Sequence, residues 1–445
     1  MKRTLPILLL IAMLFCSAVL PCYADGTETA TGPAVTAEAS ILMDATTGTI
    51  LCGKKVDERM YPASLTKILT AIVAIELLSP DDLVIIDDEV VQTTTSWRDV
   101  KLSVGDTVTV EQAIYLLLME SNNAIAVALA KTVAGSVPAF AEMMNARAVE
   151  LHCTDTHFVT PNGLHDANHY TTVRDLATLT KHALTLPLFV EAAGRDTYAF
   201  PKTKITAAHD LVNTNWLLTG DHKLYVGNEL RSVLYDGIVC GKTGTTPEAG
   251  GCLMNVAKRD DTTLIAVVLN AGKSSDGYVD RFVDCIKILD WGFAGYHTLK
   301  AMNMDALLGV AEVKRGSTLE VDIIAPTDQY VTLPVTIEAN DLRYRTELFG
   351  PLQAPVQAGI TAGTYKIYAG DRLIGEYPCV TARDVPKGGF LSRFGIPDAK
   401  AYRIYRTVAI VFASLAGLAA AGAVYTLVRG DSRRPRRIFR RRSRF

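Results

Sequence analysis

Residues 61–78 carry the sequence YPASLTKILTAIVAIELL, and this stretch decides the fold of the chain around it. From Ser64 onward it is apolar on nearly every face of a helix, which predicts a buried helix over residues 64–78. The spacing of three places the side chains of Ser64 and Lys67 on one face. Helix N-termini favour developing negative charge, and a neutral, partly desolvated lysine can take a serine proton. A capping serine followed by a surface lysine has the same pattern, so this stretch alone leaves both interpretations open.

The segments around this helix predict a mixed domain. Residues 39–52 predict a hairpin, because ILMD and TILC flank the turn residues ATTG. The order of elements predicts an α+β domain over residues 37–300, with an antiparallel sheet against a helical cluster. Its other elements are helices over 110–151 with breaks near 120–122 and 135, strands at 237–246, 250–258 and 262–270, and a closing helix at 280–294.

The sequence changes character after residue 300. Short alternating runs at 319–324, 330–337 and 364–369 predict a small all-β domain over residues 301–385. Residues 25–36 are rich in Thr, Ala and Gly and are typical of a flexible linker. Residues 386–406 begin with a Gly/Pro/basic stretch and predict a juxtamembrane linker.

Two further motifs accompany the Ser64 helix. Ser121-Asn122-Asn123 falls in the break between two predicted helices, where Ser and Asn are also ordinary helix caps. Lys242-Thr243-Gly244-Thr245 falls on a predicted strand, and a glycine there lets a substrate approach the strand edge closely. Each motif alone is weak. Ser-x-x-Lys, Ser-x-Asn and Lys-Thr-Gly in this order, in these settings, form the motif set of penicillin-interacting serine enzymes.

With these motifs in place, the chain resembles the low-molecular-mass penicillin-binding proteins that are serine-type D-alanyl-D-alanine carboxypeptidases. The resemblance covers roughly residues 35–385 and implies that residues 301–385 form a β-sandwich domain. Beyond the motifs it rests on YPASLTK at 61–67, PNGLH at 161–165, NTNWLL at 213–218, DGI at 236–238 and PLQAPV at 351–356.

The resemblance implies a catalytic role for five residues. Ser64 is expected to attack the carbonyl between the two terminal D-alanines of a peptidoglycan stem peptide, with Lys67 as its base. Ser121 would relay a proton to the leaving amine, and Asn123 would hold a substrate amide. Lys242 would supply positive potential and order Ser121.

The same resemblance implies a substrate-binding strand. Thr243 and Thr245, on either side of Gly244, would bind the terminal carboxylate. The backbone N–H groups of Ser64 and Thr245 would form the oxyanion hole. The resulting acyl-enzyme would be released by water, and a β-lactam would acylate Ser64 in the same way. No metal and no organic cofactor is expected.

Three alternatives remain open beside the carboxypeptidase. A class A β-lactamase needs a Glu-x-x-x-Asn loop, and none of the glutamates between Asn123 and Lys242 begins one. A penicillin-binding sensor or scaffold would be acylated without turnover. D,D-endopeptidase activity on cross-links would use the same chemistry.

The chain departs from the family pattern at two places near the Lys-Thr-Gly strand. Thr214 stands where some relatives have an arginine that helps bind the carboxylate, which leaves Arg231 as a weak candidate for a second cation. The extra residues 239–241 leave the register of the strand open.

The two ends of the chain predict its location. Residues 1–24 resemble a signal peptide, with an N-terminal membrane anchor as the alternative. Residues 407–428 carry no charge and are long enough to span a bilayer. The tail, 429–445, holds nine Arg and one Asp, which predicts that it stays in the cytoplasm while the rest lies outside. The net charge of −2 is a sum over segments of opposite charge, and residues 25–406 alone carry a net charge of −12. So acidic a segment is unlike a nucleic-acid-binding domain.

The cysteines and histidines predict neither a disulfide scaffold nor a metal site. The six cysteines after residue 24 show no Cys-x-x-Cys pairing. If one pair forms, Cys240 with Cys252 is the preferred choice, because both lie on neighbouring predicted strands. The histidines and the cysteine that crowd one polar loop are better explained as loop structure than as metal ligands; they are His152, Cys153, His157, His165 and His169.

Overall fold

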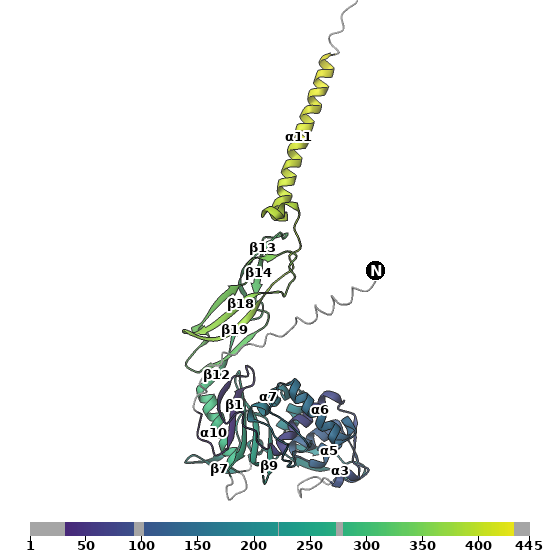
Figure 1. Cartoon of the computed structure of the whole chain (residues 1–445), viewed down its shortest axis with the longest axis vertical. Helices are drawn as coiled ribbons and strands as arrows, with labels where there is room; N and C mark the ends of the chain where they lie inside the picture. The colour runs from purple at the N-terminus through teal and green to yellow at the C-terminus, as the bar shows by residue number, and fades with distance from the viewer. Residues whose placement is uncertain (1–31, 93–101, 221, 273–278, 431–445) are drawn as a thin grey trace, which may run out of the picture. The chain divides into compact units, whose positions relative to one another are not determined.

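A computed structural model describes residues 32–92, 102–220, 222–272 and 279–430 and divides the chain into two compact units (Figure 1). The larger unit, named the catalytic unit because it contains the residues expected to be catalytic, extends to Lys300 and includes Tyr330–Asp341. The C-terminal unit contains Ala301–Gln329 and the described residues from Leu342 to Gly430. The predicted signal peptide, residues 25–31 of the first linker and residues 431–445 of the tail lie outside the described residues.

A five-stranded antiparallel sheet forms the centre of the catalytic unit, with strand order β2-β1-β11-β10-β9. The predicted hairpin is confirmed as β1 and β2, and the strand that carries Lys242 lies at an edge of the sheet. The strands are β1 (Ala39–Asp44), β2 (Ile50–Lys54), β9 (Ile238–Thr246), β10 (Gly250–Arg259) and β11 (Thr262–Ala271).

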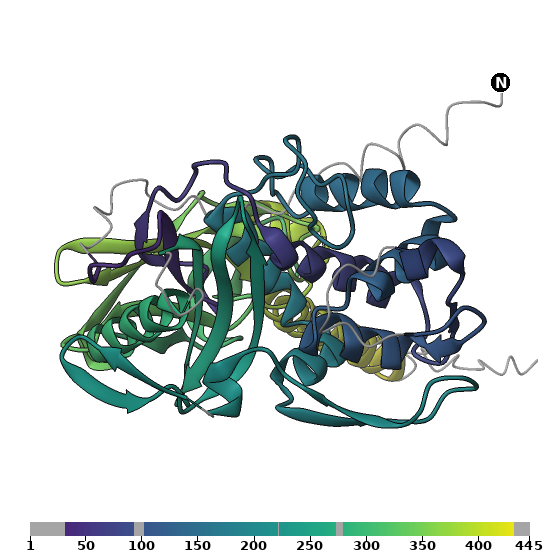
Figure 2. The same ribbon diagram turned by 90° about the horizontal axis from the view of Figure 1, so that it is seen from below.

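Both faces of this sheet are buried, which explains the unbroken apolar run in β11. Ile265 and Val267 belong to the core under the helical cluster, whereas Ala266 and Val268 belong to the core under α10 (Asp280–Gly295). Alternate residues of a strand point to opposite faces, so a strand covered on both sides has no polar alternation. Figure 2 shows the sheet between α10 and the helical cluster.

The helical cluster surrounds α2 (Lys67–Leu77), which is buried from Lys67 to Ala74. The predicted breaks are confirmed, because Asn122 caps one helix and Gly135, with φ of 76°, ends it. Ser136 then caps the next helix. The other helices of the cluster are α4 (Val110–Met119), α5 (Asn123–Ala134), α6 (Val137–Glu150), α7 (Val173–Ala183) and α8 (Pro187–Gly194).

Shorter elements complete the catalytic unit and its margins. They are the antiparallel pairs β3 (Leu83–Ile85) with β4 (Thr107–Thr109), β5 (Thr197–Phe200) with β6 (His209–Val212) and β7 (Lys223–Val226) with β8 (Glu229–Ser232), the pair β12 (Tyr296–Met302) with β15 (Gln329–Pro334), and the short helices α3 (Asp88–Gln92), α9 (Trp216–Thr219) and η2 (Ala339–Asp341).

The C-terminal unit confirms the predicted small β domain, except that the run at 330–337 falls in the other unit, where β15 pairs with β12. Its six strands follow the order β16-β18-β19-β14-β13-β17, and β13 with β17 is a parallel pair, whereas the other pairs are antiparallel. The strands are β13 (Leu307–Lys314), β14 (Glu320–Ile324), β16 (Leu342–Leu348), β17 (Leu352–Gln353), β18 (Thr361–Ala369) and β19 (Arg372–Thr381).

The segment predicted as a linker over residues 386–406 is ordered in the structure. It contains the short helix η3 (Phe390–Phe394) and the start of α11 (Asp398–Gly430). The backbone N–H of Ser317 donates to the Pro386 carbonyl, and that of Asp398 donates to the Ser317 carbonyl. These bonds tie the segment to the β domain, which the Gly/Pro composition did not reveal. Among the described residues, α11 is the one helix long and apolar enough to cross a membrane unless a bent helix pair is counted as one span.

All six cysteines in the described part of the chain are free and buried, so the preferred Cys240–Cys252 pair is wrong. The register explains why, because Cys240 lies opposite Val256 whereas Cys252 lies opposite Gly244. Burial raises the pKa of the Cys240 thiol to about 12 and that of Cys252 to about 11. Since the thiolate is the reactive form, both thiols are inert in the folded protein.

We predict that a thiol reagent modifies these six cysteines slowly in the folded protein and completely after unfolding without reductant. The measurement is a colorimetric thiol count before and after denaturation. A count two thiols short in the unfolded, unreduced protein would show that a disulfide forms after all.

Candidate active site

Ser64 lies in the single 3-10 turn η1 (Ala63–Thr66), which runs directly into α2. The apolar pattern predicted a helix that begins at Ser64, but the α-helix begins at Lys67. The structure brings the two side chains together, with Lys67 Nζ 3.0 Å from Ser64 Oγ. The spacing of three that suggested this pair holds through the 3-10 turn because such a turn eclipses residues three apart.

Lys67 is fully buried, and its amine is surrounded by oxygen atoms from separate segments. Besides Ser64, its Nζ donates to Asn123 Oδ1 at 2.8 Å and to the Asn162 carbonyl at 2.6 Å. Asn123 is the first residue of α5, and Asn162 belongs to the loop before α7. Buried lysines are rare unless paired, so these contacts identify a site rather than a surface lysine.

The three residues of the Ser121-Asn122-Asn123 motif have different environments in the structure. Asn122 is the helix cap, since its Oδ1 accepts from the Ile125 N–H at 3.0 Å. Ser121 has a φ of 62°, and its buried Oγ has no hydrogen-bond partner among the described residues. Because Asn122 caps the helix and Ser121 is in the left-handed conformation, the side chain of Asn123 is not needed as the cap, and its Oδ1 accepts from Lys67 Nζ.

Lys242 is almost fully buried on β9, and its Nζ donates to the Thr243 carbonyl at 2.9 Å. Burial lowers the pKa of Lys242 well below its usual value, and the positive charges of Lys67 and Arg281 lower it further. The structure does not join Lys242 to Ser121, whose Oγ is unpartnered among the described residues. Lys242 therefore lies at the site, whereas the expected contact that would order Ser121 is not present among the described residues.

The register of β9 is regular through the Lys-Thr-Gly motif. Lys242 pairs with Met254, and Thr245 pairs with Gly251. The register shifts between Cys240 and Ile238, so Val239 is the inserted residue of a bulge. Of the extra residues 239–241, only Val239 is accommodated by the bulge, whereas Cys240 and Gly241 pair regularly with β10.

Two glycines let β9 approach its neighbours. A Cβ on Gly244 would lie 3.1 Å from both the Ser64 nitrogen and the Pro62 carbonyl oxygen, so β9 packs directly on the turn that contains Ser64. The sequence predicted that Gly244 lets a substrate approach the strand closely. In the structure, the turn that contains Ser64 makes this close approach to Gly244. A Cβ on Gly241 would lie 2.4 Å from Asn215 Nδ2, which donates to Asn255 Oδ1.

The site contains a cation that the sequence did not reveal. Arg281, in the first turn of α10, donates to Thr245 Oγ1 at 2.6 Å and to the Gly244 carbonyl at 3.1 Å. Arg231 instead pairs with Asp290 at 2.8 Å, so the weak candidate for a second cation was wrong. Nothing in the local sequence marks Arg281, because the sheet brings α10 beside β9 only in the folded chain.

Thr214 also reaches this strand. Its Oγ1 lies 2.7 Å from Thr243 Oγ1 and donates to the Met119 carbonyl at 3.2 Å. The position that an arginine takes in some relatives is therefore filled here by a hydroxyl pair that fixes Thr243.

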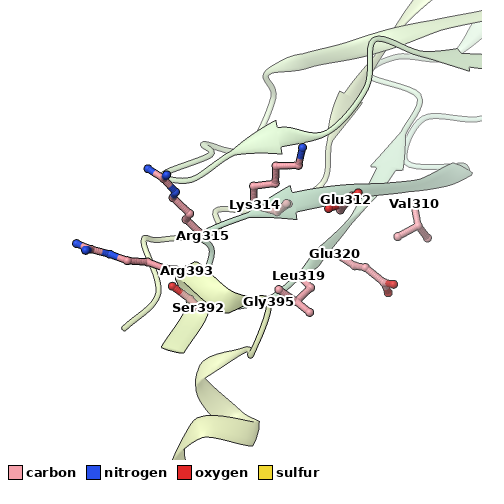
Figure 3. A pocket seen from close by; sticks show the side chains of 10 residues that line it. Val310, Glu312, Lys314, Arg315, Leu319, Glu320, Ser392, Arg393 and Gly395 are labelled. Carbon is pink, nitrogen blue, oxygen red and sulfur yellow. The ribbon is translucent and has the colours of Figure 1, made fainter. Parts of the chain in front are cut away.

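A separate pocket of about 720 Å³ lies in the C-terminal unit (Figure 3). It contains none of the motif residues, and its Ser392 hydroxyl donates to the Gly389 carbonyl rather than to a base. Its walls come from β13, from the start of β14 and the residues between these strands, and from η3 with the glycine that follows it; they are Val310, Glu312, Val313, Lys314, Arg315, Leu319, Glu320, Ser392, Arg393 and Gly395.

The chain is similar to known proteins over both of its units. The family model for D-alanyl-D-alanine carboxypeptidase matches residues 26–273, and that for the penicillin-binding protein 5 C-terminal domain matches residues 296–387. The chain is 28% identical to D-alanyl-D-alanine carboxypeptidase DacF of Bacillus subtilis, over 88% of this chain and 97% of the relative. It is 32% identical to DacC of Escherichia coli, over 82% of this chain and 88% of the relative.

A solved structure has the same fold. The crystal structure of penicillin binding protein 5 from Haemophilus influenzae superposes with a TM-score of 0.70 at 28% identity, covering 80% of this chain and 99% of that one. The superposed region is long enough to include parts of both the catalytic unit and the C-terminal unit. The chain therefore belongs to the D-alanyl-D-alanine carboxypeptidase family of serine hydrolases and carries the C-terminal domain of penicillin-binding protein 5.

Proposed function

We propose that the protein removes the terminal D-alanine from peptidoglycan stem pentapeptides through an acyl-enzyme on Ser64. The observation that carries the proposal is the 3.0 Å contact between Lys67 Nζ and Ser64 Oγ at a fully buried amine. β-Lactams would acylate the same serine. The reaction uses only side chains and backbone groups of this chain.

Lys67 is placed to act as the base that activates Ser64. Asn123 Oδ1 and the Asn162 carbonyl can only accept, so an amine at this point directs an N–H at each. In its neutral form the amine then turns its lone pair toward Ser64 Oγ. Lys67 would take the hydroxyl proton as Ser64 attacks the substrate carbonyl.

Ser121 and Asn123 are assigned to the departure of D-alanine and to substrate binding. The buried, unpartnered Ser121 Oγ is the group we assign to the proton relay toward the leaving D-alanine amine. Asn123 uses its Oδ1 on Lys67, which leaves Nδ2 to donate to a substrate amide. Lys242 would favour a negatively charged intermediate and would meet Ser121 once substrate is bound.

The oxyanion hole is assigned to the backbone N–H groups of Ser64 and Thr245. The close packing of Gly244 on the Ser64 nitrogen supports it, because it brings β9 alongside the nucleophile's turn. Fixed N–H donors of this kind contribute about 3 kcal/mol each to transition-state stabilisation. Thr243, Thr245 and Arg281 would bind the terminal carboxylate, with Arg281 as the second cation.

The proposed domain organisation follows the sequence. It comprises a signal peptide (1–24), a linker (25–36), the catalytic domain (37–300), the β-sandwich domain (301–385), the juxtamembrane segment (386–406), the span (407–428) and the basic tail (429–445). Since arginines after a span stay in the cytoplasm, we place the catalytic domain outside the cell membrane and the tail inside. The long apolar helix α11 supports a single-pass anchor.

The full chain in detergent is expected to release D-alanine from a stem pentapeptide, and Ser64→Ala to lose at least about 10³-fold in kcat/KM. The matched control is Ser79→Ala, since Ser79 is exposed and outside the site. D-Alanine is measured enzymatically. Penicillin labelling without D-alanine release would favour the sensor, and fast penicillin hydrolysis would favour the β-lactamase.

Arg281→Gln is expected to lower kcat/KM for the pentapeptide about 10-fold to 100-fold, because it removes the cation beside Thr245. Arg231→Gln is the matched control and should stay near wild type, since its partner Asp290 lies elsewhere. The readout is D-alanine release from substrates with a free or an amidated carboxyl end. An equal loss on both substrates would refute carboxylate recognition by Arg281.

A further inference from the structure

His169 lies beside the nucleophile's turn although it is 103 residues away in sequence from its nearest partner there. Its ring is 2% exposed, and its Nε2 lies 2.7 Å from the Oγ1 of Thr66. Thr66 is itself fully buried and sits between Ser64 and Lys67. The imidazole touches neither of these two residues directly.

The hydrogen bonds fix the tautomer of His169. Its Nδ1 lies 3.0 Å from the Val159 nitrogen and 3.4 Å from the Thr160 nitrogen, and both are backbone N–H groups that can only donate. Nδ1 therefore carries the lone pair, and Nε2 carries the proton. His169 consequently donates to Thr66, and Thr66 donates in turn to the Ala63 carbonyl at 2.8 Å.

The ring is held neutral in this arrangement. It stacks on Phe158 with a centroid separation of 4.8 Å, and burial lowers the pKa of His169 to about 4. Among the charged groups nearby, Asp166 raises this pKa, whereas His157, His165 and Lys67 lower it further. A proton on Nδ1 would also point at two N–H groups, so the donor at Nε2 is permanent near neutral pH.

The turn that receives this hydrogen bond is strained. Ala63 has a φ of 48°, a left-handed conformation that non-glycine residues adopt only when their surroundings hold them there. The loop before α7 supplies that hold at a second point, because a Cβ on Gly163 would lie 2.0 Å from the Ala63 oxygen and 2.8 Å from Thr66 Oγ1. The same loop gives the Asn162 carbonyl to Lys67.

We propose that His169 is a positioning residue for acylation, which fixes the Ala63–Thr66 turn through Thr66 and so keeps Ser64 aligned with Lys67. The chain runs from the Val159 N–H through His169 and Thr66 to the Ala63 carbonyl. His169 contacts no reacting atom. The proposal rests on the proposed role of Ser64 as the nucleophile.

The test compares His169→Leu, His169→Gln and Thr66→Val in the full chain. The measurement is the second-order rate of acylation by a fluorescent penicillin, divided by the number of sites that finally become labelled. His169→Leu and Thr66→Val are each expected to lose about 10-fold to 100-fold per labelled site. Glutamine can accept from Val159 and donate to Thr66, so His169→Gln should retain most of the rate.

Two further variants sharpen the test. The double variant His169→Leu/Thr66→Val should lose no more than the worse single variant, because both break one chain of hydrogen bonds. His157→Leu is the matched control, since His157 is exposed in the same loop and its Nδ1 contacts the Asn168 carbonyl rather than the turn. It is expected to acylate at the wild-type rate.

A purely structural role would overturn the proposal and has a distinct signature. The His169→Leu protein would then melt lower and show fewer labelled sites, yet the remaining sites would react at the wild-type rate. Additive losses in the double variant would also contradict a single chain of hydrogen bonds. Failure of the proposed function is distinguishable. A wild-type protein without penicillin label on Ser64 would refute Ser64 as the nucleophile, and label without D-alanine release from the pentapeptide would refute the carboxypeptidase alone.

Discussion

The site depends on burying the amine of Lys67. An amine removed from water must find polar partners, and this one finds Ser64, Asn123 and the Asn162 carbonyl. Those partners come from η1, α5 and the loop before α7, so one buried group holds three segments of the catalytic unit in place. The helical cluster around α2 buries the amine, and a base at this point must present a neutral amine to Ser64.

The edge strand β9 completes the site from the opposite side. Its glycine at 244 packs on the nitrogen of Ser64, and the bulge at Val239 leaves the motif in regular register with β10. Arg281 then approaches Thr245 from α10. The sheet is therefore a scaffold that brings Ser64, the strand β9 and Arg281 together from distant parts of the chain.

The sequence correctly predicted those features of the fold and the site that depend on residues close together in the chain. The apolar run after Ser64, the caps around Asn122 and Gly135 and the spacing to Lys67 are short-range signals, and the structure agrees with them. Arg281, His169 and the Asn162 carbonyl could not be found this way, since each meets the site across a long sequence separation and a carbonyl has no side-chain signature. The Cys240–Cys252 pairing was wrong for a related reason, because the strand register, which places these residues opposite Val256 and Gly244, cannot be read from composition.

The central claim is that Lys67 activates Ser64 and no other serine. Mass spectrometry of the penicillin-treated protein tests it most directly, because trypsin cleaves after Arg59 and Lys67 and isolates Ser64 on the peptide Met60–Lys67. The account predicts one penicilloyl group, located on Ser64 of that peptide. An adduct on any other residue, or an unmodified Met60–Lys67 peptide from folded protein treated with excess penicillin, would contradict it.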